Sequence, residues 1–458
     1  MGSLFYGIDY EDPVKRYRGE RVLKTLAKIK DGRKARSHYS LETAIDVFYA
    51  MYLPFPVLNK KLDLDEKDTY VRYLIISSMI STKWYMELKK YTMIDPVPST
   101  IAAAVFLRNL HLGLQKQGFM PGKDLLDAQG KGFQQQTHAE GDQGRIDNIR
   151  DTVKKQVTDS LRKTVKTLST ARELVNTIKS FAAGNTSLLT LEEAIPDIAR
   201  LSENTDVREI LEYLKGVDIG GLKFTRELSR WFKGETTGLE YGTDLERIHP
   251  HELALPEELF YANFANHRLL LYQKSLPLRK GPVYVLIDKS GSMVGEKMLW
   301  AKALTISLLK KSLREGRTFY MRFFDSRLYP VYKATPRIRG TCLVRLIDML
   351  SRIKPQGGTD ITRAVKTAAR DVSKEKRRRD KPGDLIIVTD GEDTLDTTLL
   401  KSLLQRSGLR LVVVMVKGEN ESLKKAADVY LKVKSLGGKE IRVVLRYLHG
   451  RPVERSHT

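Results

Sequence analysis

The chain is long, strongly basic and poor in cysteine. Its 458 residues predict two or three domains rather than one. No stretch reaches the roughly 20 uninterrupted apolar residues that a membrane span needs. The N-terminus lacks a basic segment followed by an apolar one, and the single Cys342 excludes an internal disulfide framework. Together these features predict a cytoplasmic protein without a transmembrane segment.

The positive charge is concentrated in the C-terminal part of the chain. The formal net charge is +23, and residues 281–458 carry 37 Lys and Arg against 19 Asp and Glu, a net of +18. Residues 1–280 therefore contribute only +5. Such a field attracts nucleic acid or an acidic protein surface, but a heavily charged surface also simply keeps a protein soluble. Charge alone leaves both interpretations open.

The first 118 residues are predicted to be mainly helical. Apolar residues recur at helical spacing over 41–52, 70–92 and 99–117, and Ser40 is placed to cap the first of these helices. From 119 to 144 this periodicity stops and Gly, Gln and Asp accumulate, which indicates a flexible linker.

Residues 145–280 are predicted to form a second helical region that contains one long helix, about 146–182. Its apolar stripe needs a partner, which is either the protein's own core or another chain. Shorter helices are expected at about 190–202, 206–215 and 251–275. The residues that mark the stripe of the long helix are Ile146, Ile149, Val153, Val157, Leu161, Val165 and Leu168.

From residue 281 to 435 short apolar runs alternate with helical patterns. This alternation predicts an α/β domain with a doubly wound, mostly parallel, Rossmann-like sheet. A C-terminal helix and tail, 436–458, follow. The predicted strands are 283–288, 318–325, 328–333, 384–390, 409–416 and 429–433, and the predicted helices are 293–313, 341–353, 360–376 and 395–406.

Three separate segments supply oxygen ligands where a strand or a turn meets a helix. They are Asp288-Lys-Ser-Gly-Ser292, Gly357-Gly-Thr-Asp360 and Thr389-Asp-Gly-Glu392. In open α/β sheets such positions border one crevice beyond the carboxyl ends of the strands. Oxygen-only ligands favour a hard divalent cation, so we expect Mg²⁺, or otherwise Mn²⁺ or Ca²⁺.

This motif order resembles the metal-ion-dependent adhesion site of von Willebrand factor A domains. The resemblance covers roughly 283–435. It implies that Ser290, Ser292 and Thr359 contact the metal directly and that Asp288 and Asp390 act as outer ligands or through water. It further implies that a carboxylate of a partner protein fills the open metal position. Lys289 stands between two ligands and is expected to point away from the metal.

The wider layout is similar to the ViaA and CoxE-like proteins. A helical N-terminal half precedes Glu252-Leu-Ala-Leu-Pro-Glu-Glu-Leu-Phe260 and Leu269-Leu-Leu-Tyr272, and the A-type domain follows. This resemblance implies a chaperone-like adaptor that works with a MoxR-type AAA+ ATPase, such as RavA, in remodelling or maturing a client protein complex.

Catalysis is not expected. The chain has no phosphate-binding Gly-x₄-Gly-Lys-Ser/Thr loop, its eight histidines are scattered, and Ser290 does not stand in a nucleophile elbow. The main rival to protein binding is RNA or DNA binding by the basic run 374–381. An A domain joined to a large helical region also resembles Ro ribonucleoproteins, although that run lacks aromatic residues for base stacking.

Overall fold

The computed structural model describes residues 4–59, 67–118, 140–181, 188–215, 217, 228–277, 281–336, 340–374, 382–391, 393 and 396–448. The chain divides into two compact units, and neither is continuous in sequence. The first comprises Met1–Tyr213 and Ile338–Ile353, and the second comprises Leu214–Arg337 and Lys354–Thr458. The expected boundary near residue 281 marks the start of the large sheet, whereas the compact units divide elsewhere.

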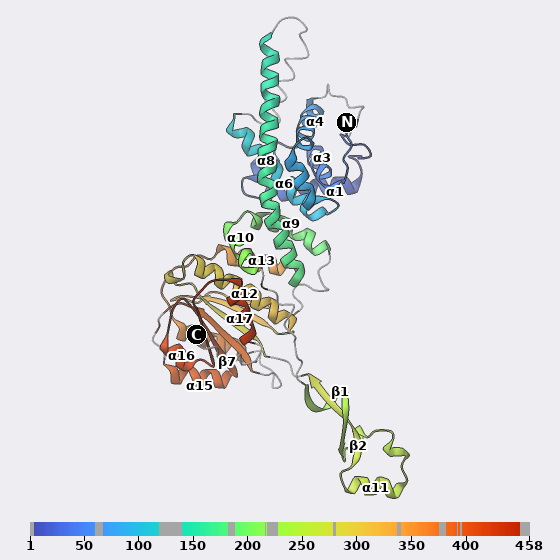
Figure 1. The fold of residues 1–458 in the computed structure, drawn as a ribbon, viewed down its shortest axis with the longest axis vertical. Coiled ribbons are helices and arrows are strands. Elements are labelled where there is room, and N and C mark those ends of the chain that lie inside the picture. Colours follow the sequence, from blue (N-terminus) through green and yellow to red (C-terminus); the bar gives the residue numbers. More distant parts are fainter. Residues whose placement is uncertain are drawn as a thin grey trace. The chain divides into compact units, whose positions relative to one another are not determined.

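The described part of the first unit is helical (Figure 1). The helix predicted over 41–52 is α3, and the Ser40 hydroxyl caps it by accepting a hydrogen bond from the Thr43 N–H. Pro96 stands in the first turn of α6, where its missing N–H costs nothing. The helices are α1 (Pro13–Lys28), α2 (Gly32–Arg36), α3 (Leu41–Tyr52), α4 (Lys67–Ile80), α5 (Lys83–Thr92), α6 (Pro96–Lys116), α8 (Glu140–Phe181), α9 (Leu188–Ser202), α10 (Thr205–Leu214) and α13 (Gly340–Arg352).

The long predicted helix is α8, and its apolar stripe belongs to the core of this unit. Val153, Val157, Leu161 and Leu168 are buried, and α8 packs against α4, α5, α6 and α9. The stripe from Val153 to Leu168 therefore has an intramolecular partner, whereas the side chains of Ile146 and Ile149 lie outside the described residues. By length and composition α6 alone among the described helices could cross a membrane, but 78% of the relevant window is buried, so it is weak evidence for a span.

A charged network is buried among these helices. The Tyr10 hydroxyl donates a hydrogen bond to one oxygen of Asp46 at 2.8 Å, and Arg72 donates to the other at 3.0 Å. Arg72 also pairs with Asp68 at 3.1 Å. Asp46 and Arg72 are 0% and 1% exposed, so the network replaces hydration that folding removes. It joins α3 and α4 to the N-terminal segment.

Helix α13 belongs to the helical unit although its sequence lies within the predicted A-type domain. Its buried residues, which include Leu346, Ile347 and Leu350, pack with α8 and α9 (Figure 1). Asp348 of α13 forms an ion pair with Arg200 of α9 at 3.0 Å. The chain thus passes from the second unit into the first and back within one loop of the sheet domain.

The second unit begins with an antiparallel hairpin, where the structure corrects one prediction. Residues 251–275 were expected to be helical, but only α11 (Glu257–Ala265) and a short 3₁₀ turn (Glu252–Ala254) are, and Leu269–Pro277 is strand β2. This strand pairs with β1 (Leu228–Gly242). The apolar run at Leu269 is too short for its periodicity to distinguish helix from strand, and its partner is distant in sequence.

The remaining elements form a six-stranded sheet with helices between the strands. Its order is β5-β4-β3-β6-β7-β8, and all neighbouring pairs are parallel except β4 with β5. The strands are β3 (Val283–Asp288), β4 (Phe319–Phe324), β5 (Tyr332–Ala334), β6 (Gly383–Thr389), β7 (Leu409–Val416) and β8 (Val429–Val433). The helices are α12 (Glu296–Arg314), α14 (Ile361–Ser373), α15 (Thr397–Ser407), α16 (Glu421–Ala426) and α17 (Gly438–Tyr447), and shorter 3₁₀ turns are Leu245–Arg247 and Gly291–Met293.

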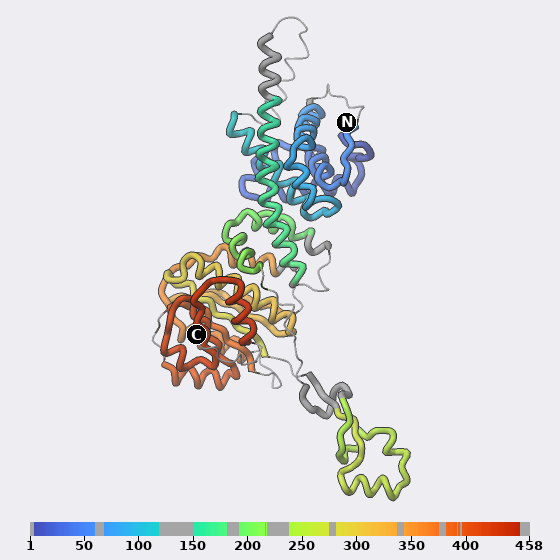
Figure 2. The backbone as a smooth tube through the Cα atoms, in the orientation of Figure 1, coloured from blue at the N-terminus to red at the C-terminus, as the bar shows by residue number. Residues whose placement is uncertain are grey.

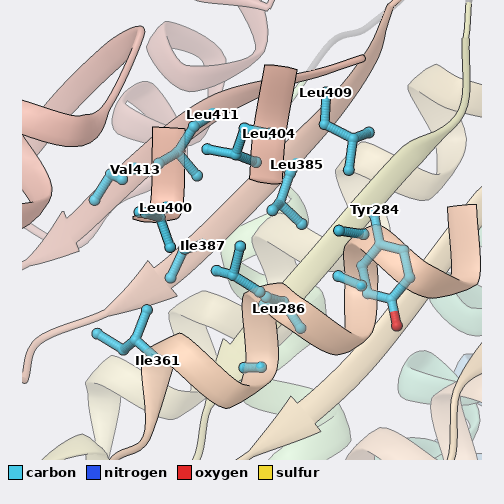
Figure 3. Packing of buried hydrophobic residues seen from close by; sticks show 14 of the residues in the cluster. Tyr284, Leu286, Ile361, Leu385, Ile387, Leu400, Leu404, Leu409, Leu411 and Val413 are labelled. Carbon is cyan, nitrogen blue, oxygen red and sulfur yellow. The ribbon is translucent and has the colours of Figure 1, made fainter. Parts of the chain in front are cut away.

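Helices cover both faces of this sheet. Side chains of α14, α15 and α16 interdigitate with alternate residues of β3, β6 and β7, among them Leu286, Ile387 and Val413 (Figure 3). Helices α12 and α17 lie side by side (Figure 2), and α12 packs against β3 and β4. Every residue of β3 and β6 is buried, as expected for central parallel strands. The predicted α/β, doubly wound, mostly parallel fold is confirmed.

Candidate metal centre

The three oxygen-bearing segments meet at the carboxyl edge of the sheet. The chain goes from β3 to β4 on one side, and β6 then pairs with β3 on the other side. The strand order therefore reverses between β3 and β6, where an open α/β sheet forms its crevice. Ile287 pairs with Val388, so Asp288 and Thr389 follow at neighbouring strand ends.

Asp288 forms the base of the site. One of its carboxylate oxygens accepts the Ser290 N–H at 2.8 Å, and the other accepts the Thr389 hydroxyl at 2.5 Å. The Ser290 hydroxyl lies 3.1 Å from that of Ser292, and Ser292 donates to Asp390 at 2.7 Å. Four of the five predicted ligands, those from β3 and β6, are thus joined in one continuous network.

Thr359 reaches the same point from the loop before α14. That loop is fastened to the Asp288–Ser292 turn because Gly291 donates to the carbonyl of Gly357 at 3.0 Å. The φ angle of Gly357 is +93°, a conformation that favours glycine. A Cβ atom added to Gly391 would lie 3.3 Å from both the Thr359 hydroxyl and the Asp288 carboxylate oxygen that accepts the Thr389 hydroxyl. The two oxygens therefore flank one small space that only the absence of a side chain at Gly391 leaves open.

The donor chemistry of this space fits a hard divalent cation. Two carboxylates and three hydroxyl groups surround it, which is an all-oxygen set. Asp288 is 0% exposed, and no lysine or arginine within the described ranges pairs with it. Burial raises the pKa of Asp288, although the hydrogen bonds from Thr389 and Ser290 oppose this effect. A buried carboxylate without a cationic partner is costly, and a bound cation would remove that cost.

The site is shaped by hydroxyl groups rather than by a cluster of acids. Among the described residues, no group of three or more His, Cys, Asp or Glu side chains is placed to hold a metal ion. Any cation here would therefore depend on Ser290, Ser292 and Thr359 for most of its protein contacts. Asp288, at the base, and Asp390, beside Ser292, supply the negative charge.

Two lysines stand close to the site, and only one was considered from the sequence. Lys289 faces away from the carboxylates, as expected, because its ammonium pairs with Asp325 at 3.4 Å and lies 4.3 Å from the centre of the Tyr329 ring. Lys297, in the first turn of α12, instead binds Asp390 at 2.5 Å. Sequence reasoning missed Lys297, although its position one helical turn after the serine motif was a usable signal.

Residues 283–392 match the family profile described as the von Willebrand factor type A domain. An uncharacterized protein of Methanocaldococcus jannaschii is 24% identical over 446 residues, which cover 93% of this chain and 96% of that protein. A putative VWFA domain-containing protein of Acidianus two-tailed virus is 25% identical over 237 residues, which cover 48% of this chain and 25% of the viral protein.

Solved structures with a similar fold include two that each match 37% of this chain. BatB from Bacteroides thetaiotaomicron is 17% identical and covers 37% of this chain and 97% of its own, with a TM-score of 0.29. Proximal thread matrix protein 1 from the mussel byssus, solved with a zinc-occupied MIDAS motif, is 18% identical and covers 37% of this chain and 46% of its own, with a TM-score of 0.30. Together, the profile match and the strand order identify the six-stranded sheet and its helices as a von Willebrand factor A-type domain that follows a mainly helical N-terminal region.

Proposed function

We propose that this protein is a metal-dependent interaction module that captures a carboxylate of a partner protein at the edge of its A-type sheet. The observation that carries the proposal is the placement of Asp288, which is fully buried at the base of an oxygen-lined space and forms no ion pair with a Lys or Arg among the described residues. Mg²⁺ is the default cation for such a donor set, and Mn²⁺ and Ca²⁺ are the alternatives.

Each part of the chain has a distinct role in this proposal. Ser290, Ser292 and Thr359 would hold the cation, and Asp288 and Asp390 would orient those hydroxyl groups and balance the charge. When bound, the cation supplies a positive charge that attracts an Asp or Glu side chain of the partner. Helix α14 begins at Ile361, and the carboxylates of Asp393 and Asp360 already accept its Ile361 and Arg363 N–H groups, which fixes the helix end beside Thr359.

We further propose that the partner is a MoxR-type AAA+ ATPase and that the helical region engages a client protein complex. The support is the resemblance of the layout to ViaA and CoxE-like proteins together with the absence of a phosphate loop in the sequence. The ATPase would supply energy, and this chain would act as a binding adaptor rather than as a catalyst. That division of roles is an analogy at the level of architecture.

Nucleic-acid binding by the run 374–381 remains the second candidate function. Of that run only Lys374 lies within the described residues. The Ro-like interpretation therefore gains no support from the geometry of the run itself.

The test begins with the cation alone. Titration of the full chain with Mg²⁺ and Mn²⁺ by calorimetry should give one binding event that disappears in a variant carrying Asp288→Ala and Ser290→Ala. As a control, Ser402→Ala with Glu421→Ala removes one hydroxyl and one carboxylate from exposed helix positions of the same unit. Circular dichroism should show that both variants remain folded.

Partner binding is measured second, with a purified MoxR-type ATPase from the same genome. Capture in Mg²⁺, loss in EDTA and loss in the Asp288/Ser290 variant would support both parts of the proposal. If the chain binds the cation but does not capture the ATPase, the proposal of metal-dependent docking stands and the proposal that the ATPase is the partner is rejected. Capture that is unchanged in EDTA and in the folded variant would contradict the metal site as the docking surface.

A further inference from the structure

A second pocket lies between α14 and α15, at the ends of these helices that are remote from the metal centre. Its volume is about 450 Å³, within the usual range for ligand pockets. Helix α14 spans 13 residues, or about 20 Å at 1.5 Å per residue, and its first turn adjoins Thr359. The pocket is therefore separate from the metal site. Its lining residues are Lys366, Ala369, Arg370, Ser373, Lys374, Leu403, Arg406 and Ser407.

Helical periodicity explains why these residues line one hollow. On α14 they recur at intervals of three and four, as do the three residues on α15, so each set occupies one face of its helix. Neighbouring positions of α14, such as Val365, Ala368 and Val372, are buried against the sheet. The sheet therefore fixes the rotation of α14 and turns the charged face toward α15.

The charge of the pocket is entirely positive. Lys366, Arg370, Lys374 and Arg406 line it, and among the described residues no Asp or Glu does. Within the part of the chain that the structure describes, none of these four side chains forms an ion pair with a carboxylate. Four like charges around one hollow repel each other, and an anion within it would relieve that repulsion.

Helix dipoles explain part of this arrangement but not all of it. Arg370 and Arg406 stand in the last turns of α14 and α15, where the interaction of a cation with the helix dipole stabilises the helix by about 0.3–1 kcal/mol. Lys366 stands seven residues before the end of α14, beyond the reach of that effect. Its presence on the same face points to a ligand rather than to helix capping.

We propose that this pocket binds the phosphate backbone of a nucleic-acid strand. Guanidinium groups such as those of Arg370 and Arg406 match phosphate oxygens with paired hydrogen bonds, and the lysines add point charges. Ala369 and Leu403 provide an apolar floor for a sugar or a base edge. The described lining includes no aromatic residue, so recognition works through phosphates and is independent of base sequence.

A long polyanion suits this unit better than a local acidic peptide. The surplus of +18 charges in residues 281–458 extends well beyond the four cations of the pocket. A nucleic acid presents phosphates continuously and gains affinity from each cation it meets by releasing counterions. This function goes beyond the proposed metal-dependent docking and does not depend on it.

The test is fluorescence anisotropy of a labelled single-stranded oligonucleotide with the full chain in EDTA. The pocket variant carries Lys366→Gln, Arg370→Gln and Arg406→Gln. A matched control carries Lys439→Gln, Arg442→Gln and Arg446→Gln, which removes three exposed cations from α17 in the same unit. The two variants have the same net charge, so only the position of the lost cations differs.

The pocket variant should bind at least tenfold more weakly, and the control should stay within about threefold of the wild type. Each lost phosphate contact should flatten the dependence of log K on log salt by about 0.7, or about 2 for all three. Equal loss in both folded variants would overturn the proposal, because binding would then follow overall charge. No oligonucleotide binding by the wild type at about 50 mM salt, or preferential binding of polyglutamate, would also overturn it.

Discussion

Lys297 should weaken cation binding at the metal centre, and Lys297→Met should therefore strengthen it. The ammonium of Lys297 already occupies one oxygen of Asp390 at 2.5 Å, while Ser292 donates to the other at 2.7 Å. A divalent cation that shares this carboxylate must approach a positive charge. The lysine thus competes with the cation for Asp390 in the arrangement described above.

The size of the effect follows from the charges. For one single and one double charge about 5 Å apart, Coulomb's law gives roughly 2 kcal/mol in water and roughly 7 kcal/mol at an effective dielectric constant of 20. The Lys297 side chain is 26% exposed and can turn toward solvent, so the lower figure is the better guide. We expect Mg²⁺ or Mn²⁺ affinity to rise about tenfold to thirtyfold, which corresponds to about 1.4–2 kcal/mol.

Calorimetric titration of the full chain at low salt measures this change. Lys297→Arg keeps the charge and should leave cation affinity within about threefold of the wild type. Raised salt should reduce the difference in cation affinity between Lys297→Met and the wild type. Unchanged or weaker cation binding by folded Lys297→Met would refute the reasoning. Such a result would mean that Lys297 supports the geometry of Asp390 rather than competing for it.

Three further predictions concern the rim of the metal centre and the buried network of the helical unit. Gly391→Ala should lower cation affinity about tenfold in calorimetry, because its Cβ would enter the space between Asp288 and Thr359. The Tm should fall by no more than a few degrees. Unaltered cation affinity would mean that the cation binds elsewhere. Arg72→Met should lower the free energy of unfolding, measured in urea, by about 3–5 kcal/mol, because it leaves Asp46 buried without its cationic partner. A loss below about 1 kcal/mol would mean that the buried network does not stabilise the fold. Burial raises the pKa of Asp46 to about 7, against about 3.9 in the unfolded chain. The free energy of unfolding of the wild type, relative to that of Asp46→Asn, should therefore rise as the pH falls from about 7 to 4. A decrease in this difference over that range would contradict the raised pKa of Asp46.

The sheet domain and the convergence of its three oxygen-bearing segments were predictable because their signals are local. Val283–Asp288 and Gly383–Thr389 are short, mostly apolar runs, and a motif lies at the end of each. The convergence of the three segments follows from the rule that parallel strands present their carboxyl ends at one edge. The predicted positions of Asp288, Ser290, Ser292, Thr359 and Asp390 therefore needed no knowledge of long-range packing.

Features that depend on distant partners could not be predicted in the same way. Strand β2 is recognisable only through its pairing with β1, and the Leu269–Leu271 run is compatible with a helix when taken alone. The pairing of Lys297 with Asp390 joins residues 93 positions apart. The basic pocket likewise requires the relative placement of α14 and α15, which their separate sequences do not specify.

The position of α13 has a mechanical consequence. The helix ends at Arg352, and the chain reaches the ligand Thr359 after only six intervening residues. A pull exerted on a partner held at the metal centre would therefore be carried along the backbone directly into a helix anchored on α9 by packing and by the Arg200–Asp348 pair.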